Sequence, residues 1–273
     1  LLNEFIWANL RGLIYSFNVC FHLMKYENDE KVVIYTRIWH VLLIYIMFQK
    51  VGLLNIRIFY EAHKFSKPLV NVISKIDGLI VINEFLKKKY NNFGLNRILT
   101  SHDGVNLNEH ANISPYKFIP NKEEFTILYT GSLFKWKGVE TLVNSIDFLP
   151  KNFKLVCVGG SGRHLRDFKS YVNKSLNSDR IKVIAHKPKK EVLKFVEDAD
   201  VLILPNSAKD KMSLYTSPIK LFEYMASNRP IIASNISSIS EILSNRNSLL
   251  FESDSSEDLA KKILISASLD CQK

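Results

Sequence analysis

Short apolar runs with strand character alternate with helical segments along most of this chain, and this alternation limits the fold more than any other feature. The strand-like runs are 31–35, 56–60, 78–82, 98–100, 125–129, 154–158, 181–185, 201–204, 231–233 and 248–251. The segments with helical spacing are 1–25, 39–51, 67–75, 84–91, 139–149, 162–176, 189–198, 217–226, 238–243 and 254–267. Strands separated by helices pair in parallel and are covered by those helices. The sequence therefore predicts an α/β fold with parallel sheets and helices on both faces.

A polar stretch divides this alternation into two parts. Residues 106–124 carry Pro115 and Pro120, and the strand–helix pattern restarts directly after them. A chain of 273 residues is long enough for two domains of ordinary size. We expect a partial N-terminal domain over 1–110, a linker over 111–124, and a C-terminal domain with an incomplete end over 125–273. Ligands of open α/β sheets bind beyond the carboxyl ends of the strands, so we expect two such edges to face each other across a cleft.

Composition and charge narrow the class of protein. The chain is 47% hydrophobic and 23% charged, as in soluble globular proteins, and its net charge is +10. No nucleic-acid-binding signature accompanies the scattered lysines, so we expect no nucleic acid partner and allow peripheral contact with an anionic membrane. The cysteines Cys20, Cys157 and Cys271 lack metal or redox spacing and indicate a reducing compartment.

The ends of the chain and its apolar runs bear on localisation. The longest apolar run, 41–48, is too short to cross a bilayer, and no signal peptide is present. The chain begins without methionine in what reads as mid-helix, so we expect a protein truncated at both ends. We expect a cytoplasmic location, with contact at the inner face of the cell membrane.

The segment from Tyr215 to Ala226 carries the strongest chemical signal. Ser217 suits a helix N-cap and Pro218 the first helical position. A helix start attracts phosphate, and Lys220 adds a full positive charge there. Glu223 lies three residues later and so shares a face with Lys220. The segment predicts a site for a diphosphate and for hydroxyl groups, as in a nucleotide-sugar, although such a Lys–Glu pair more often lies on a solvated face.

Two glycine-containing loops follow predicted strands. The first runs from Gly131 to Gly138, where Gly131 permits a tight turn and Lys137 lies within reach of a phosphate. The alternative is an ordinary connection with a solvated lysine. The second, 159–162, lets a ligand approach the backbone, but it lacks the full dinucleotide fingerprint.

His63 is the remaining candidate, because it follows a predicted strand end. A lone histidine is more often structural, but this position also suits a polar contact with a substrate. Glu61 and His63 lack a third metal ligand, and no other metal-site spacing or Ser-His-Asp arrangement stands out.

Taken in order, these segments resemble the retaining GT-B glycosyltransferases of the family-4 type, also called glycosyl transferases group 1. The resemblance covers about 32–262, and its strongest part is 217–226 followed by 229–233. The segments 131–138, 159–162, 60–63 and 102–106 match in order and spacing. The resemblance implies a GT-B fold, in which two Rossmann-like domains face each other across a cleft, with the acceptor on the first and the donor mainly on the second.

The resemblance also implies roles for individual residues. The catalytic residues would be His63 at the donor sugar, Lys137 at the diphosphate and Glu223 at the ribose hydroxyls. Tyr215 stands where the family often has a first glutamate, and Ser132 where it often has arginine. The implied donor-binding residues are Gly131, Ser132, Lys137, Gly160, Lys187, Tyr215, Ser217, Pro218, Ile219, Lys220, Leu221 and Glu223.

The function so implied is transfer of a sugar from a nucleoside-diphosphate sugar to a hydroxyl of a glycan or lipid-linked glycan, with retention of configuration. The enzyme would be a hexosyltransferase-like protein of bacterial polysaccharide synthesis, making capsule or lipopolysaccharide. It would need no cofactor and no metal, because cations already stand at the phosphates. Two alternatives remain: a sugar-nucleotide epimerase of GT-B architecture, and a non-catalytic subunit that binds a nucleotide-sugar.

Overall fold

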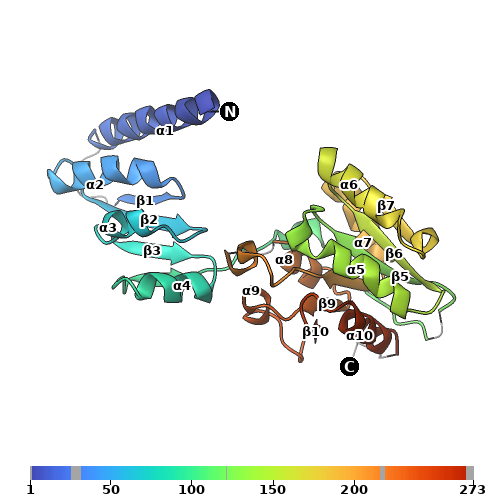
Figure 1. Cartoon of the computed structure of the whole chain (residues 1–273). Coiled ribbons are helices and arrows are strands. Elements are labelled where there is room, and N and C mark those ends of the chain that lie inside the picture. Colours follow the sequence, from blue (N-terminus) through green and yellow to red (C-terminus); the bar gives the residue numbers. More distant parts are fainter. Residues whose placement is uncertain (1, 26–31, 121, 216–218, 269–273) are drawn as a thin grey trace. The chain divides into compact units, whose positions relative to one another are not determined.

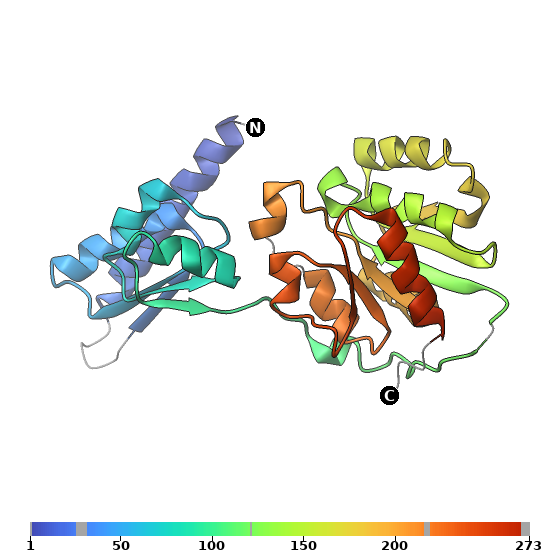
Figure 2. The same cartoon turned by 60° about the horizontal axis from the view of Figure 1, so that its bottom comes forward.

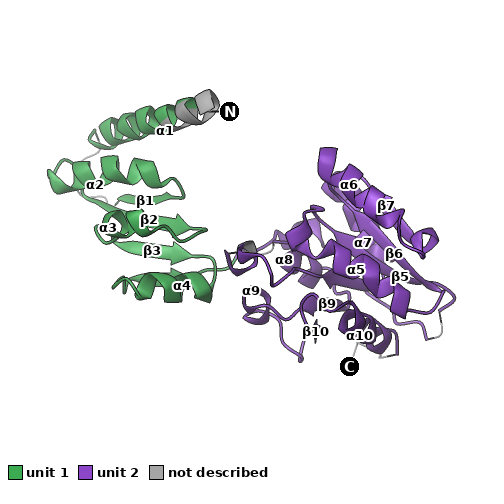
Figure 3. Ribbon diagram, viewed as in Figure 1, with its two compact units in different colours: residues 1–102 green, residues 103–273 purple. Residues whose placement is uncertain are grey.

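The computed structural model describes residues 2–25, 32–120, 122–215 and 219–268. The chain divides into two compact units, Leu1–His102 and Asp103–Lys273 (Figure 3). Residues 103–124, which include the segment expected as a linker, group with the second unit. No helix in these described ranges combines the length and the apolarity that a membrane crossing requires.

The first unit is built on a four-stranded parallel sheet in the order β1-β2-β3-β4 (Figure 1). Helix α1 packs on α2, which packs on β2, and α4 packs on β3 and β4. Helix α4 begins where it does because Asn83 caps it, its Oδ1 accepting the N–H of Leu86 at 2.9 Å. The strands are Val32–Thr36, Ile56–Ala62, Gly78–Val81 and Ile98–Thr100, and helices α1–α4 are Leu2–Leu23, Leu42–Lys50, Val70–Ile73 and Glu84–Asn91.

The second unit is built on a six-stranded parallel sheet in the order β10-β9-β8-β5-β6-β7 (Figures 1 and 2). The chain starts in the middle at β5, builds outward to β7, and returns to build the other half from β8. Its strands β5–β10 are Phe125–Thr130, Phe153–Val158, Ile181–Ile184, Val201–Leu204, Ile231–Ser234 and Leu249–Phe251. Its helices α5–α10 are Val139–Ser145, Gly162–Val172, Lys189–Asp198, Ile219–Met225, Ser237–Ser240 and Ser256–Ser268. The reversal between β5 and β8 is a topological switch point, where open sheets of this kind bind ligands.

Alternation along the strands of the second unit produces two separate cores. Ile127 and Tyr129 of β5 point into a cluster with side chains of α5, α6 and α10. Leu128, between them, points into a cluster with α7, α8 and α9. Because both faces are apolar, the strands read as nearly continuous hydrophobic runs, as expected for a buried parallel sheet. The α/β class with parallel sheets predicted from the sequence is therefore confirmed.

The ends of several helices differ from those predicted from the sequence. The helix expected over 39–51 is a 3-10 turn, Trp39–Val41, followed by α2. The helix expected to reach residue 176 ends at Val172, and Leu176 is exposed. The predicted cap residues Ser217 and Pro218 lie outside the described residues, and α8 is described from Ile219.

Candidate functional site

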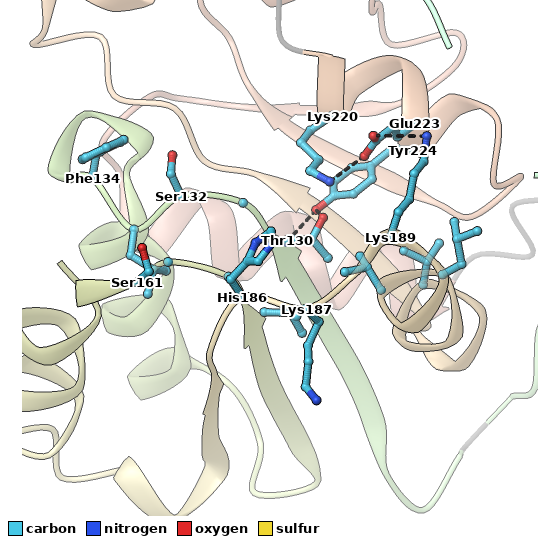
Figure 4. Close-up of a pocket in the computed structure, with 18 of the residues that line it drawn as sticks. Thr130, Ser132, Phe134, Ser161, His186, Lys187, Lys189, Lys220, Glu223 and Tyr224 are labelled. Atoms are coloured by element: carbon cyan, nitrogen blue, oxygen red, sulfur yellow. Dashed lines mark hydrogen bonds and ion pairs between the residues drawn. The ribbon is translucent and has the colours of Figure 1, made fainter. Parts of the chain in front are cut away.

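A pocket of about 450 Å³ opens in the second unit at the carboxyl ends of β5, β6 and β7 (Figure 4). The loop after β5 contributes Gly131 and Ser132, and the loop after β6 contributes Gly159 and Gly160. Further side chains come from the segment after β7 and from α7 and α8. The pocket thus lies beside the switch point that the sheet order defines.

The two glycine loops pack main chain against main chain. The N–H of Gly131 donates to the carbonyl of Val158 at 3.0 Å, and the N–H of Gly159 donates to that of Ile184 at 2.9 Å. A Cβ on Gly159, whose φ is +140°, would lie 2.0 Å from the carbonyl oxygen of Gly131. Only glycine fits there, because any side chain would overlap the main chain of the neighbouring loop.

Tyr224 joins α8 to the end of β5 by hydrogen bonds. Its hydroxyl oxygen accepts the N–H of Thr130 at 2.8 Å and lies 3.1 Å from Oγ1 of the same threonine. Tyr224 is 1% exposed, and burial holds the pKa of its phenol well above the usual value, so it remains neutral. This contact fixes the face of α8 that carries Lys220 and Glu223 relative to the first glycine loop.

Charged side chains meet at this face. Nζ of Lys220 donates to Oε2 of Glu223 at 2.6 Å, and Nζ of Lys189 lies 3.8 Å from Oε1 of the same carboxylate (Figure 4). Lys187, also in the lining, pairs with Glu191 at 2.9 Å. The Glu223 side chain is 18% exposed. A recess with open backbone, cations and one carboxylate can hold an anion beside hydroxyl groups.

The structure gathers half of the sequence-predicted donor-site residues in this pocket. Those in its lining are Gly131, Ser132, Gly160, Lys187, Lys220 and Glu223. The others lie elsewhere: Tyr215 is half-buried outside the lining, Ile219 is exposed, and Leu221 is buried in the core beneath α8. Ser217 and Pro218 fall outside the described residues. The roles assigned to all of these residues stay predictions.

Lys137 does not line the pocket. It ends the 3-10 turn Lys135–Lys137, and its Nζ lies 4.0 Å from the centre of the Trp136 ring. Burial lowers the pKa of Lys137 from 10.5 to about 8. The side chain is therefore a desolvated cation at pH 7, and its predicted contact with a diphosphate stays a prediction.

His63 belongs to the first unit, where it follows β2. Its Nε2 lies 2.6 Å from Oε1 of Glu61, and Nη2 of Arg37 lies 2.8 Å from the same oxygen. Glu61 is buried, whereas the His63 side chain is 42% exposed. The sequence analysis found His63 and Glu61 as neighbours but missed Arg37, and the role of His63 at a donor sugar remains a prediction.

Other pocket residues also escaped the sequence analysis. Lys189 begins α7 after the short loop 185–188 that follows β7, and a lysine at a helix start after a strand is the same signal that Lys220 and Lys137 gave. Thr130 and Tyr224 are 94 residues apart, so no local pattern links them. Within the described part of the chain, no group of three or more His, Cys, Asp or Glu side chains is placed to hold a metal ion.

The fold and the pocket define an α/β protein with a pocket beside the switch point of its larger sheet. Its family follows from comparison with known proteins. The chain belongs to the glycosyl transferases group 1 family, whose model matches residues 113–268.

The most similar relatives include an uncharacterized glycosyltransferase of Methanocaldococcus jannaschii, 27% identical over 189 residues, with 69% of this chain and 49% of that protein covered. The chain thus spans about half the length of the curated relatives it matches. Among solved structures, Anabaena HepE in complex with UDP has a TM-score of 0.72 at 14% identity, covering 93% of this chain and 72% of that one. The lipopolysaccharide outer core galactosyltransferase WaaB has a TM-score of 0.70 at 17% identity, covering 93% and 70%. These structures share the GT-B fold with this chain.

Proposed function

We propose that this protein transfers a sugar from a nucleoside-diphosphate sugar to a hydroxyl of a glycan or a lipid-linked glycan, with retention of configuration. The observation that carries the proposal is the arrangement of Lys220 and Glu223 in one pocket with the two glycine-containing loops that follow β5 and β6. A diphosphate needs cations and N–H groups, and a ribose needs a hydrogen-bond acceptor. Family membership and the UDP bound to HepE support the same ligand class.

The proposed chemistry is electrostatic stabilisation of a leaving group. As the bond between sugar and diphosphate breaks, negative charge grows on the diphosphate. Lys220, Lys137 and backbone N–H groups would stabilise that charge most strongly in the transition state. Because these cations neutralise the phosphates, we propose that the reaction needs neither a metal ion nor a cofactor. Glu223 would hold the ribose and so orient the donor.

The proposals for the acceptor and for the cellular setting rest on the charge of the chain and on one similar structure. The net charge of +10 favours an anionic glycan or an anionic membrane surface as a neighbour. The name of WaaB connects the fold with lipopolysaccharide. We therefore propose a hexosyltransferase-like role in bacterial polysaccharide synthesis at the cytoplasmic face of the membrane.

A panel of nucleotide-sugars tests the proposal. The purified protein is incubated with each donor, with and without a glycan or lipid-linked acceptor, and release of nucleoside diphosphate is measured. Transfer predicts release that depends on the acceptor, with the product's anomeric configuration matching the donor's. Interconversion of donors without release would instead identify an epimerase, and tight donor binding with no turnover would identify a non-catalytic binding subunit.

A further inference from the structure

Four charged side chains of alternating sign form a row along the pocket of the second unit. Glu109 pairs with Lys189. Lys189 lies 3.8 Å from Oε1 of Glu223, and Lys220 donates to Oε2 of Glu223 at 2.6 Å (Figure 4). Each oxygen of Glu223 therefore faces a different lysine. The two lysines come from different elements, α7 and α8.

In the proposed function, Lys220 binds the diphosphate and Glu223 binds the ribose. In the structure, the two side chains instead bind each other. Turning Lys220 toward a diphosphate would lengthen its 2.6 Å contact with Oε2 of Glu223. When Lys220 turns to the phosphate, Oε2 of Glu223 becomes free to accept from a ribose hydroxyl. The carboxylate then keeps one neighbouring cation, Lys189, on its other oxygen.

Lys189 is also paired with a second carboxylate, that of Glu109. Glu109 lies on the 3-10 turn Leu107–Glu109, and the hydrogen bond from Lys189 lowers the pKa of the Glu109 carboxyl. Lys189 thus stands between two carboxylates. Its distance to Oε1 is longer than a hydrogen bond, so it acts on Glu223 by charge and orientation.

Resting on the function proposed above, we propose that Lys189 is a positioning residue for nucleotide ribose recognition. It holds the Glu223 carboxylate in place once Lys220 has moved to the diphosphate, and Glu109 holds Lys189. Lys189 does not touch the nucleotide in this arrangement. Its contribution to binding therefore exists only when the ligand carries ribose hydroxyls for Glu223 to accept.

This dependence on the ribose gives a direct test. Calorimetry measures the Kd of UDP, GDP and ADP with the wild-type protein, and the tightest ligand is compared with its 2′,3′-dideoxy analogue. The ratio of the two Kd values reports the ribose contribution. In Lys189→Met this ratio should fall by about two- to fivefold, the range for a partly exposed ion pair. Any general loss of attraction for the diphosphate affects both ligands and cancels in the ratio.

Three further variants sharpen the comparison. Lys190→Met removes the same charge from the next residue of α7, which is exposed and outside the pocket lining, and should leave the ratio unchanged. Lys189→Arg should restore most of the ratio, and Glu109→Gln should lower it less than Lys189→Met does.

An unchanged ratio in Lys189→Met overturns the positioning role while leaving the proposed function intact. A wild-type protein that binds none of the three diphosphates overturns both.

Discussion

Replacing Lys137 with methionine is expected to stabilise the protein while impairing its activity. The methionine keeps an unbranched apolar stem in the space that Lys137 occupies and removes only the buried charge. Lowering the lysine pKa from 10.5 to about 8 means that the folded state disfavours the ammonium. At about 1.4 kcal/mol for each pKa unit, the difference corresponds to about 3 kcal/mol.

Thermal and denaturant unfolding at pH 7 measure this cost. A gain of about 3 kcal/mol raises the Tm of a unit of this size by about 6–12 °C. Lys135→Met is the matched control, because Lys135 lies in the same turn with its side chain 90% exposed, and its loss should leave the Tm nearly unchanged.

The pH dependence distinguishes a charge effect from a packing effect. Below pH 8, Lys137 is protonated in the folded and unfolded states, and the cost is present in full. Between pH 8 and 10.5, the folded protein loses this proton while the unfolded chain keeps it, so the wild type gains stability as the pH rises. The advantage of Lys137→Met should therefore shrink over this window and vanish near its upper end.

Activity supplies the second half of the test. If Lys137 serves the diphosphate, Lys137→Met should lower turnover by about 10²–10³-fold, as when one transition-state donor is lost. A variant that is no more stable than the wild type, or whose advantage is constant between pH 7 and 10, would refute the desolvation argument. Near-normal turnover would instead remove Lys137 from catalysis.

Four other outcomes are expected. Glu223→Gln should weaken nucleoside diphosphate binding by about 1.5–3 kcal/mol in calorimetry, because a charged acceptor makes stronger hydrogen bonds to hydroxyls than an amide does. His63→Ala should lower sugar transfer per folded molecule while leaving nucleotide affinity nearly intact; an unchanged rate would exclude His63 from the site. Gly138→Ala should destabilise the fold by at least about 2 kcal/mol, because the new Cβ would lie 1.7 Å from the carbonyl oxygen of Pro205, whereas Gly52→Ala, with similar φ and open space, should cost less. A chelator should leave turnover unchanged, and rescue by added Mg²⁺ would contradict the proposed role of lysine cations.

The parts of the structure predicted from the sequence are those that local patterns determine. The strands of the second unit are apolar on both faces, so their positions follow directly from the sequence. The pairing of Lys220 with Glu223 was expected from their spacing, and the bond at 2.6 Å confirms that they share a face. Neither prediction required knowledge of the tertiary structure.

The remaining features depend on contacts between distant segments. The bond between Thr130 and Tyr224 forms only when α8 packs across β5. The desolvation of Lys137 depends on how its loop folds back, since the neighbouring Lys135 remains exposed. The approach of Lys189 to Glu223 likewise joins two helices whose packing no local spacing specifies.

The packing of the glycine loops also has an evolutionary consequence. At the closest point between them, a side chain on Gly159 would collide with the main chain of Gly131, and no change in a neighbouring side chain can relieve such a collision. The groups through which the two loops meet at this point are main-chain groups, which every residue type carries. Selection on such a surface acts on a few glycines and leaves most surrounding positions free to drift. A deep mutational scan of these loops should therefore show isolated positions that tolerate nothing, separated by positions that tolerate almost anything.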